Sequence, residues 1–399
     1  MKKVLIVTHG NLPLPNIKGG AVEKLVQYII DYNEERADFD LTVLSCHDEN
    51  AQCTSETYRK VKFVYLHNSF PKWRWYVNRL FYKILKFSIL KTEYIDNVQK
   101  YLRKHKESYD IVIFENNPQF ILHKMPKVKA TKIFHIHNDW FSDNQMSNVF
   151  YRRRMISGAK CYNCFFCVSP FIKSNVDKYV RAEKNIVVNN GVDSLVDNSK
   201  KDEIITNLCE KLQIEADNFV FMYSGRLVRE KGVLELLQAF SLTTNKKFKL
   251  IVVGGADYSS NSKTEYVNQL EEFAIHDNRI VFTGYVDAKQ MPYYNIISNV
   301  VVVPTYWVEE AGALSAIEAI QENNVLIVSD SGHLKWWGEQ DCSLLIQRNE
   351  DFVSNLSKAI NLIGSDSKLY EAKKSAAAEL STMYTSIAYY NQFKQNLSI

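Results

Sequence analysis

Hydrophobic residues along this chain fall into short continuous runs, separated by longer stretches with helical spacing. Runs such as 4–8 (VLIVT) and 300–303 (VVVV) are typical of strands buried on both faces of a parallel sheet. Helical patterns separate most of them, so we predict a doubly wound α/β fold in each half. The predicted strands are 4–8, 41–45, 61–66, 111–115, 132–137, 165–169 and 186–189 in the first half, and 219–224, 249–253, 280–283, 300–303, 326–329 and 344–346 in the second.

The length of the chain also favours two domains, since 399 residues exceed one ordinary core. The run NNGVD at 189–193, followed by polar residues through Asp202, predicts the boundary between them. The aromatic-rich tail, 380–397, predicts one last packed helix. Other predicted helices cover 22–34 in the first half, and 232–241, 265–274, 314–321 and 351–363 in the second.

The stretch from the strand 300–303 to Ile320 has the pattern of a ligand site. An acidic turn, Glu309-Glu310, leads into a helix whose first N–H groups, near Ala313 and Leu314, suit a phosphate. Glu310 falls in the turn and Glu318 lies further along the helix, so both carboxylates could hydrogen-bond a hydroxyl-rich ligand. The alternative is a solvated acidic turn with one surface glutamate.

A second candidate site follows the strand 219–224. Arg226 and Lys231 lie in its loop, and Gly232 opens the next helix, an arrangement that suits a diphosphate. A basic surface loop is the alternative. Near the start of the chain, Gly19-Gly20 opens a helix after the first strand and would let the backbone approach a phosphate, although a plain turn is the commoner use of such a pair.

These motifs stand in one order along the chain: Gly19-Gly20, SGRLVREKG at 224–232, FTGYV at 282–286, and the Glu310/Glu318 pair. In this order and spacing the chain resembles glycosyltransferase family 4, retaining enzymes of the GT-B fold, over nearly its whole length. NNGVD is similar to the family's PNGVD linker, and HIHN at 135–138 to its N-domain histidine motif. Within the family, the resemblance is nearest to bacterial envelope-polysaccharide enzymes, including capsular and lipopolysaccharide types.

The resemblance implies two Rossmann-like domains that face across a cleft. Residues 1–192 would form the acceptor domain and residues 193–382 the nucleotide-sugar donor domain, with the C-terminal helix near 383–399 packing back on the first. The donor would be a nucleotide sugar, most simply a UDP-sugar carrying a hexose or N-acetylhexosamine. The acceptor would be a growing glycan or a polyprenyl-linked glycan in cell-envelope polysaccharide synthesis.

The resemblance also implies a role for each matching residue. Arg226 and Lys231 would hold the diphosphate, Glu318 the ribose, and Glu310 the sugar hydroxyls. His137 would line the cleft against the transferring sugar. The remaining donor contacts would be Gly19, Gly20, Tyr285, Val286, Ala313 and Leu314. One departure is that Gly312-Ala313 replaces the family's Phe-Gly in the acidic turn, and adjacent Glu309 leaves the first glutamate position ambiguous by one.

No cofactor or metal is expected. Asp38-Phe39-Asp40 spells a D-x-D metal motif, but it lies in a charged turn before a strand. His135 and His137 share a strand face near Asp139, where a metal site is conceivable and a hydrogen-bonded cleft histidine is favoured. Cys161, Cys164 and Cys167 are spaced as in iron–sulfur sites but are interpreted as structural thiols, because no fourth ligand is evident.

Residues 71–91 combine cations with aromatic residues and contain no acid. As a helix, this segment would place Lys72, Arg79, Lys83 and Lys86 near one face, beside an apolar stripe that starts at Trp73. That pattern is typical of a helix at an anionic membrane surface. A helix packed on its domain with a solvated basic side is the alternative.

Composition limits the other classes of function. A net charge of +4 is too small to argue for a nucleic-acid partner. The first apolar run is too short for a secretory signal, and seven cysteines without a regular framework fit a reducing compartment, so we expect a cytoplasmic protein at the inner face of the membrane. Two rival functions stay open: a UDP-sugar 2-epimerase of the same fold, and a catalytically idle nucleotide-sugar-binding subunit. A nicotinamide dehydrogenase is disfavoured, since the first βα turn lacks G-x-G-x-x-G.

Overall fold

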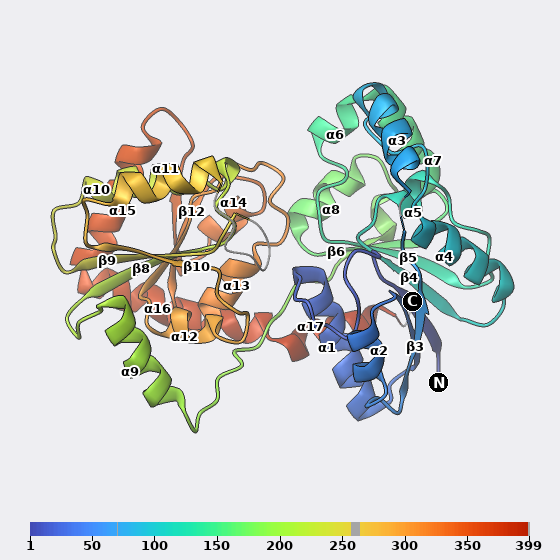
Figure 1. Ribbon diagram of the computed structural model, residues 1–399, viewed down its shortest axis with the longest axis horizontal. Coiled ribbons are helices and arrows are strands. Elements are labelled where there is room, and N and C mark those ends of the chain that lie inside the picture. Colours follow the sequence, from blue (N-terminus) through green and yellow to red (C-terminus); the bar gives the residue numbers. More distant parts are fainter. Residues whose placement is uncertain (70, 257–263, 398–399) are drawn as a thin grey trace. The chain divides into compact units, whose positions relative to one another are not determined.

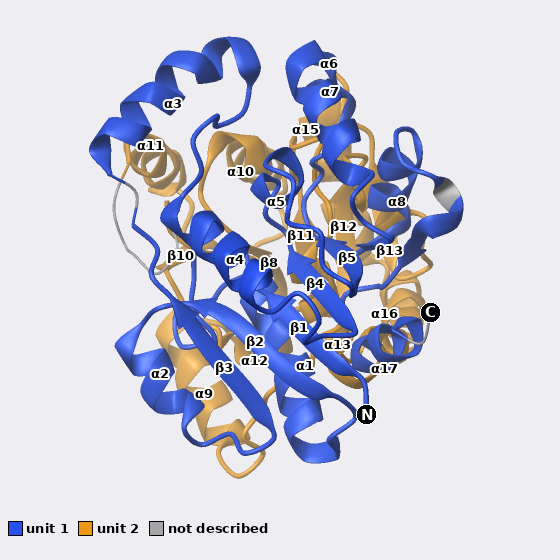
Figure 2. Ribbon diagram, turned by 90° about the vertical axis from the view of Figure 1, so that its right-hand side faces the viewer, with its two compact units in different colours: residues 1–190, 389–399 blue, residues 191–388 orange. Residues whose placement is uncertain are grey.

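The structure is a computed structural model that describes residues 1–69, 71–256 and 264–397. The chain divides into two compact units: Met1–Asn190 with Tyr389–Ile399, and Gly191–Ala388 (Figure 2). Each unit is built on one parallel sheet. The first has strand order β3-β2-β1-β4-β5-β6-β7, and the second β10-β9-β8-β11-β12-β13 (Figure 1). The prediction of two doubly wound α/β sheets is therefore confirmed.

Unit 1 owes its sheet to buried apolar strands. Val4, Leu5, Ile6 and Val7 in β1 are all fully buried, as expected for a central strand covered on both faces. Its elements are β1 (Lys3–Val7), α1 (Ala21–Arg36), β2 (Asp40–Cys46), α2 (Glu49–Ser55), β3 (Val61–Leu66), α3 (Lys72–Leu85), α4 (Glu93–Lys104), β4 (Ile111–Glu115), α5 (Gln119–Leu122), β5 (Thr131–Ile136), α6 (Asp143–Ser147), α7 (Val149–Ala159), β6 (Cys164–Cys167), α8 (Pro170–Asp177), a 3₁₀ turn (Ala182–Lys184) and β7 (Asn185–Val187).

Unit 2 repeats the scheme around the four valines of β11, which are buried. Its elements are α9 (Lys201–Leu212), β8 (Phe219–Ser224), a 3₁₀ turn (Arg229–Lys231), α10 (Val233–Ser241), β9 (Phe248–Val253), α11 (Glu265–Ala274), β10 (Ile280–Gly284), α12 (Met291–Ile296), β11 (Val300–Val303), α13 (Leu314–Gln321), β12 (Val325–Ser329), α14 (Leu334–Gly338), β13 (Ser343–Ile346), α15 (Phe352–Ser365) and α16 (Ser367–Ser381). The polar segment expected through Asp202 already becomes helical at Lys201, where α9 begins.

The tail differs from the single helix predicted over 380–397. Helix α16 ends at Ser381, a 3₁₀ turn covers Thr382–Tyr384, and α17 (Ser386–Asn396) follows. From Tyr389 onward the chain belongs to unit 1. There Tyr390 Oη donates to Asp38 Oδ2 at 2.7 Å, and Lys394 Nζ lies 2.5 Å from Asp38 Oδ1. Asp38, the first residue of the D-x-D motif, thus holds the C-terminal helix.

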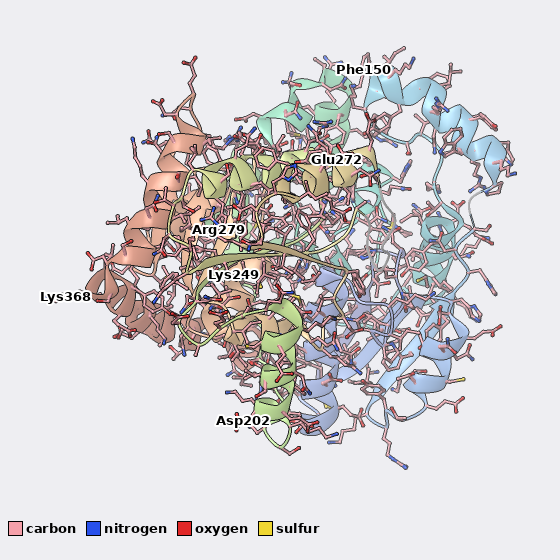
Figure 3. The ribbon with its side chains drawn as sticks, turned by 60° about the vertical axis from the view of Figure 1, so that its left-hand side comes forward. Phe150, Asp202, Lys249, Glu272, Arg279 and Lys368 are labelled. Carbon is pink, nitrogen blue, oxygen red and sulfur yellow. The ribbon has the colours of Figure 1, made fainter. Side chains whose placement is uncertain are left out.

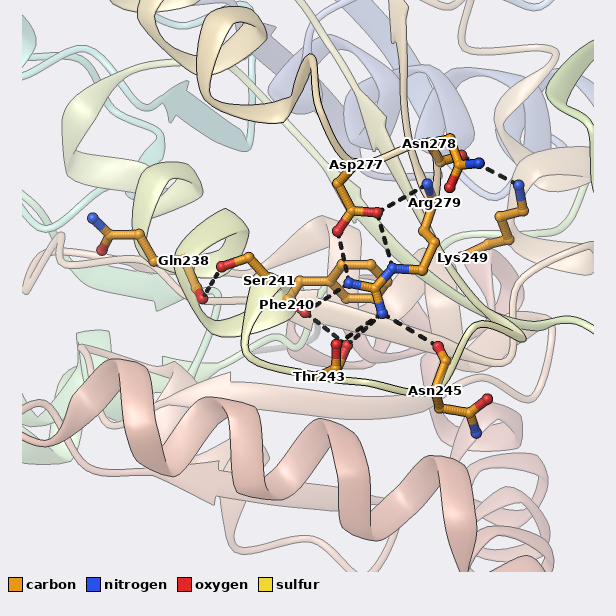
Figure 4. Close-up of polar contacts among 9 residues, drawn as sticks. All are labelled: Gln238, Phe240, Ser241, Thr243, Asn245, Lys249, Asp277, Asn278 and Arg279. Atoms are coloured by element: carbon orange, nitrogen blue, oxygen red, sulfur yellow. Dashed lines mark hydrogen bonds and ion pairs between the residues drawn. The ribbon is translucent and has the colours of Figure 1, made fainter.

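One arginine secures the end of α10 in unit 2. The guanidinium of Arg279 donates to both oxygens of Asp277, at 2.9 and 2.6 Å, and to the Thr243 carbonyl at 3.0 Å. Figure 4 shows it over the ring of Phe240, with 4.9 Å between its central carbon and the ring centroid. It thereby supplies donors to carbonyls that follow the last turn of α10.

Among the described residues, no helix combines the length and the apolarity needed to span a bilayer.

Candidate functional site

Each sheet reverses its strand order at one place, and several of the candidate site residues follow the strands there. The reversal lies between β1 and β4 in unit 1 and between β8 and β11 in unit 2. Loops at the carboxyl ends of such strand pairs are where open α/β sheets bind ligands. Gly19 and Gly20 lie in the loop after β1, and Glu115 ends β4; Arg226 follows β8, and Glu310 follows β11.

The structure joins the two candidate sites of unit 2 through an ion pair. Lys231 Nζ lies 2.6 Å from Glu310 Oε2, and both side chains are mostly buried, at 19% and 16% exposed. The same ammonium lies 5.4 Å from the ring centroid of Trp307. Of the two adjacent glutamates, Glu310 is the one that the structure places against Lys231.

A glycine allows the two loops to approach so closely. Gly232 has φ +69°, and a Cβ atom built on it would lie 2.1 Å from the Pro304 carbonyl oxygen. Any larger residue would push apart the loops after β8 and β11. Further contacts fix the loops: the Tyr306 N–H donates to the Glu230 carbonyl at 2.7 Å, and the His333 N–H donates to the Glu310 carbonyl at 2.8 Å. Backbone hydrogen bonds thus anchor the loops that carry the ammonium and the carboxylate.

The acidic turn leads into α13 through an unusual residue. Ala313 has φ +37° and ψ +55°, the left-handed conformation that usually belongs to glycine. The first helical hydrogen bond runs from the Ala316 N–H to the Ala313 carbonyl, so the N–H groups of Leu314 and Ser315 precede it. Glu318 lies in the following turn and is half-buried.

The remaining donor-binding candidates of unit 2 also lie in loops after strands. Arg226 is half-buried, and its carbonyl accepts a 2.8 Å hydrogen bond from Tyr223 Oη. Tyr285 and Val286 directly follow β10, and Tyr285 is 40% exposed. Because β10 is the outer strand beside β9, these two residues lie toward one edge of the sheet.

In unit 1, His137 belongs to a buried three-residue cluster. His137 Nε2 lies 3.0 Å from Glu115 Oε2, and His135 Nδ1 lies 3.1 Å from the same oxygen. Burial favours the uncharged imidazole and lowers the pKa of His137 to about 4. Burial alone would raise the pKa of Glu115, but the two imidazoles outweigh it and hold that pKa at about 2. A neutral His137 therefore donates Nε2–H to a carboxylate.

The other ring nitrogen of His137 is available for a ligand. Within the part of the chain that the structure describes, Nδ1 of His137 makes no hydrogen bond. With the proton on Nε2, Nδ1 is an acceptor, suited to a hydroxyl group. His135 is fully buried and stacks near Tyr389 and Phe393 of α17, at centroid distances of 6.4 and 6.3 Å.

Glu115 was missed from the sequence, and so were His9 and Glu23. His9 Nδ1 accepts the Asn11 N–H at 3.0 Å, which leaves Nε2 to pair with Glu23. Glu23 is buried in the first turn of α1, which begins directly after Gly20. Glu115 did carry a signal: it is the last residue of an apolar strand, IVIFE, and so lies at the edge of the sheet where ligands bind.

The cluster Glu115/His135/His137 is also the place where a metal ion would find ligands. One ligand atom from each residue lies within 4.8 Å of the others. The nitrogen–oxygen separations of 3.0 and 3.1 Å are equally those of hydrogen bonds. The three cysteines interpreted as structural thiols lie partly in β6, where Cys164 and Cys167 are buried and burial raises the pKa of Cys164 to about 12. That environment opposes thiolate formation.

The residues of the predicted membrane helix lie in a separate element of unit 1. Lys72, Trp73, Arg79 and Lys83 lie in α3 and Lys86 directly follows it, and all five are exposed.

Both the sequence and the fold of the chain are similar to those of known proteins. Residues 205–380 match the model of the family described as glycosyl transferases group 1. The chain is 25% identical over 396 residues to the putative glycosyltransferase YtcC of Bacillus subtilis. This match covers 96% of this chain and 89% of YtcC. It is 31% identical over 169 residues to the lipopolysaccharide 1,2-N-acetylglucosaminetransferase of Salmonella typhimurium, over 41% of this chain and 43% of that protein. The crystal structure of Anabaena Alr3699/HepE in complex with UDP superposes with a TM-score of 0.71 at 18% identity, over 99% of both chains.

Proposed function

Since the chain belongs to the glycosyl transferases group 1 family and has GT-B structural neighbours, we propose that it transfers a hexose or N-acetylhexosamine from a UDP-sugar to a glycan or polyprenyl-linked glycan. The transfer retains the anomeric configuration and serves the synthesis of an envelope polysaccharide. Similarity to a lipopolysaccharide N-acetylglucosaminyltransferase supports this reaction class. A UDP complex of a protein with the same fold supports uridine as the base.

The observation that carries the proposal is the contact of 2.6 Å between Lys231 Nζ and Glu310 Oε2. One cation and one carboxylate meet where the strand order of unit 2 reverses, next to the first N–H groups of α13. Cations and N–H donors bind a nucleoside diphosphate, and a carboxylate accepts hydrogen bonds from sugar hydroxyls. This place provides all three kinds of group.

Each candidate then has a role in holding the donor. Lys231 and Arg226 bind the diphosphate, and Glu310 turns from Lys231 to the sugar hydroxyls when the phosphate takes its place. As the sugar departs, negative charge grows on the diphosphate, and the fixed cations stabilise it. The donor contacts are completed by Glu318 at the ribose, Tyr285 and Val286 at the base, and the N–H groups of Gly19, Gly20, Ala313 and Leu314.

His137 binds the transferred sugar rather than abstracting a proton from the acceptor. Its Nε2–H is held by Glu115, so Nδ1 faces the substrate as a neutral acceptor for a sugar hydroxyl. An imidazole whose pKa lies near 4 is a weak base at neutral pH. The acceptor's proton passes to the departing phosphate oxygen, in a front-face reaction without a separate carboxylate base. The reaction proceeds without a metal, because Lys231 and Arg226 neutralise the diphosphate.

The test is thermal denaturation of the full chain with UDP, GDP, dTDP, NAD and several UDP-sugars, each with and without EDTA. A ligand that binds only the native state raises the melting temperature. We expect UDP and one UDP-sugar to raise it, with no effect of EDTA. A shift abolished by EDTA would overturn the metal-free reaction and point to Glu115/His135/His137. No shift with any nucleotide would overturn the donor site.

Product analysis separates the rival functions. With the stabilising UDP-sugar, the transferase releases UDP only in step with acceptor glycosylation, beyond a slow hydrolysis. An epimerase would instead convert the UDP-sugar without an acceptor. An idle subunit would bind UDP and turn nothing over.

A further inference from the structure

Helix α3 is mounted on unit 1 through polar contacts instead of an apolar face. The structure describes all residues of α3, and Asn78 is its one buried residue. The Asn78 amide makes two hydrogen bonds with the backbone of Leu90, at 2.9 and 2.8 Å. Arg74 Nη1 donates to the Lys91 carbonyl at 2.9 Å and lies 3.3 Å from Asp96. A helix on a soluble domain ordinarily buries its apolar stripe, and here that stripe is left outside.

The exposed side of α3 is rich in large apolar and aromatic side chains. Leu80 is 71% exposed and Ile84 is 62% exposed. At helical spacing Trp73, Tyr76, Leu80 and Ile84 form one stripe along the helix. Isolated exposed apolar residues are normal on protein surfaces, whereas a contiguous group marks a contact site. The other exposed members of this helix are Trp75, Phe81 and Tyr82.

A second segment, distant in sequence, extends the same surface. Asn148 Nδ2 donates to the Ile84 carbonyl at 2.8 Å, so the start of α7 is tied to the last turn of α3. Val149 and Phe150 follow directly and are 43% and 53% exposed. Figure 3 labels Phe150 near one end of α3. We call Trp73, Tyr76, Leu80, Ile84, Val149 and Phe150, with the cations beside them, the α3/α7 surface.

The charges beside this apolar stripe have one sign. Lys72, Arg79, Lys83 and Lys86 are exposed, and none of them has an ion-pair partner among the described residues. No aspartate or glutamate occurs between residues 71 and 91. The guanidinium of Arg79 lies 4.9 Å from the ring centroid of Trp75, as in aromatic residues that accompany cations at membrane interfaces.

We propose that the α3/α7 surface docks on an anionic lipid bilayer. The apolar stripe can enter the headgroup region, and the cations beside it can bind lipid phosphates. Both features fit an anionic bilayer. A second copy of the chain would bring like charges together, which disfavours self-association through this surface. The membrane then recruits the enzyme to lipid-linked acceptors, a consequence that rests on the proposed function, while the binding itself does not.

The test is sedimentation of the full-length chain with vesicles of phosphatidylcholine alone or mixed with phosphatidylglycerol. We expect binding to the mixed vesicles only. Arg79→Glu/Lys83→Glu should weaken that binding by about tenfold or more, since each surface cation contributes to attraction by anionic lipid. Leu80→Ser/Ile84→Ser should make the remaining binding release at lower salt. A matched control, Lys127→Glu/Lys129→Glu, makes the same charge change at exposed lysines before β5 and should bind as the natural chain does.

Two outcomes would overturn the proposal. One is absence of binding to the mixed vesicles by a chain that UDP still stabilises, which separates this proposal from the donor-site proposal. The other is equal loss of binding in the control and in Arg79→Glu/Lys83→Glu, which would indicate a response to net charge alone. Binding of a single-stranded RNA probe, without vesicle binding, would reassign the surface to nucleic acid.

Discussion

The ammonium of Lys231 and the carboxylate of Glu310 lie 2.6 Å apart although 79 residues separate them in sequence. Each is the natural partner of a different part of a nucleotide sugar, the diphosphate and the sugar hydroxyls. The two charges neutralise each other, which limits the cost of keeping both in a mostly buried place. In the proposed function, donor binding exchanges one charge partner for another.

Replacement of Lys231 tests the diphosphate assignment. Lys231→Ala should lower UDP affinity and turnover together, by roughly ten- to a hundredfold, because a charge-assisted hydrogen bond contributes about 1.5–3 kcal/mol. Isothermal titration with UDP and steady-state transfer rates measure the two effects. The matched control is Lys247→Ala, which removes a lysine that pairs with Asp217 at 2.8 Å on the surface of the same unit. Equal kinetics for the Lys231 and Lys247 variants would refute the assignment.

Replacement of Glu310 should separate nucleotide binding from transfer. Glu310→Gln removes the partner that competes with phosphate for Lys231, so UDP should bind as tightly as before or more tightly. The UDP-sugar loses a charged acceptor for its hydroxyls, so its turnover should fall by about tenfold or more. Competition of UDP against the UDP-sugar reads both effects in one experiment. Weaker binding of UDP itself would show that Glu310 supports the loop instead of the sugar.

The strands were predictable because a strand that is buried on both faces consists of a continuous run of apolar residues, which is visible in the local sequence. All of the predicted strands occur within one or two residues, including the four valines of β11. The start of α9 at Lys201 was not predicted, since its first turn is polar and resembles a linker. The sequence predicted an apolar side for α3, but it could not show that Asn78 and Arg74 hold the helix on the protein while the apolar side stays exposed.

The candidate site was predictable only where a motif carried it. Lys231 and Glu310 came from motifs, but their mutual contact depends on β8 pairing with β11, which no local pattern reveals. Glu115 was missed for the same reason. It faces His135 because β4 and β5 pair in the register Glu115↔His135, a relation between segments that lie far apart in sequence.

The buried histidine cluster predicts how stability responds to acid. The pKa of His137 falls from 6.5 to about 4 on folding, so between these values the unfolded chain binds more protons, and its free energy of unfolding decreases as the pH falls. Glu115 continues the trend below pH 4.5, because its pKa falls to about 2. Urea denaturation at several pH values should show a slope of up to about 1.4 kcal/mol per pH unit from His137. His137→Asn should flatten the curve between pH 6.5 and 4; an unchanged curve would exclude His137 as its source.

Arg279 provides a prediction for stability that is independent of the ligand site. Arg279→Lys keeps the charge but cannot donate to both Asp277 oxygens and the Thr243 carbonyl together. Because the arginine side chain is only 12% exposed, we expect a loss of about 1–3 kcal/mol in the free energy of unfolding. The control, Arg181→Lys, alters an arginine that is 76% exposed and pairs with Glu183, and should change stability by less than about 0.5 kcal/mol.

Ala313 tests whether the turn before α13 stores strain for ligand binding. Its φ of +37° is costly for alanine and easy for glycine. Ala313→Gly should therefore raise the free energy of unfolding by about 0.5–1 kcal/mol, whereas Ala378→Gly, an exposed alanine in the regular helix α16, should lower it by about the same amount. Chemical denaturation of both variants measures whether the free energy of unfolding changes in opposite directions.

The same variant then shows what the alanine contributes to the site. If Ala313 fixes the N–H groups of Leu314 and Ser315 toward a phosphate, the more stable glycine variant should bind UDP more weakly, because the ligand must now order the turn. A more stable protein with weaker UDP binding would identify the strain as part of the binding site. Unchanged UDP affinity would instead mean that the positive φ serves only to connect the acidic turn to α13.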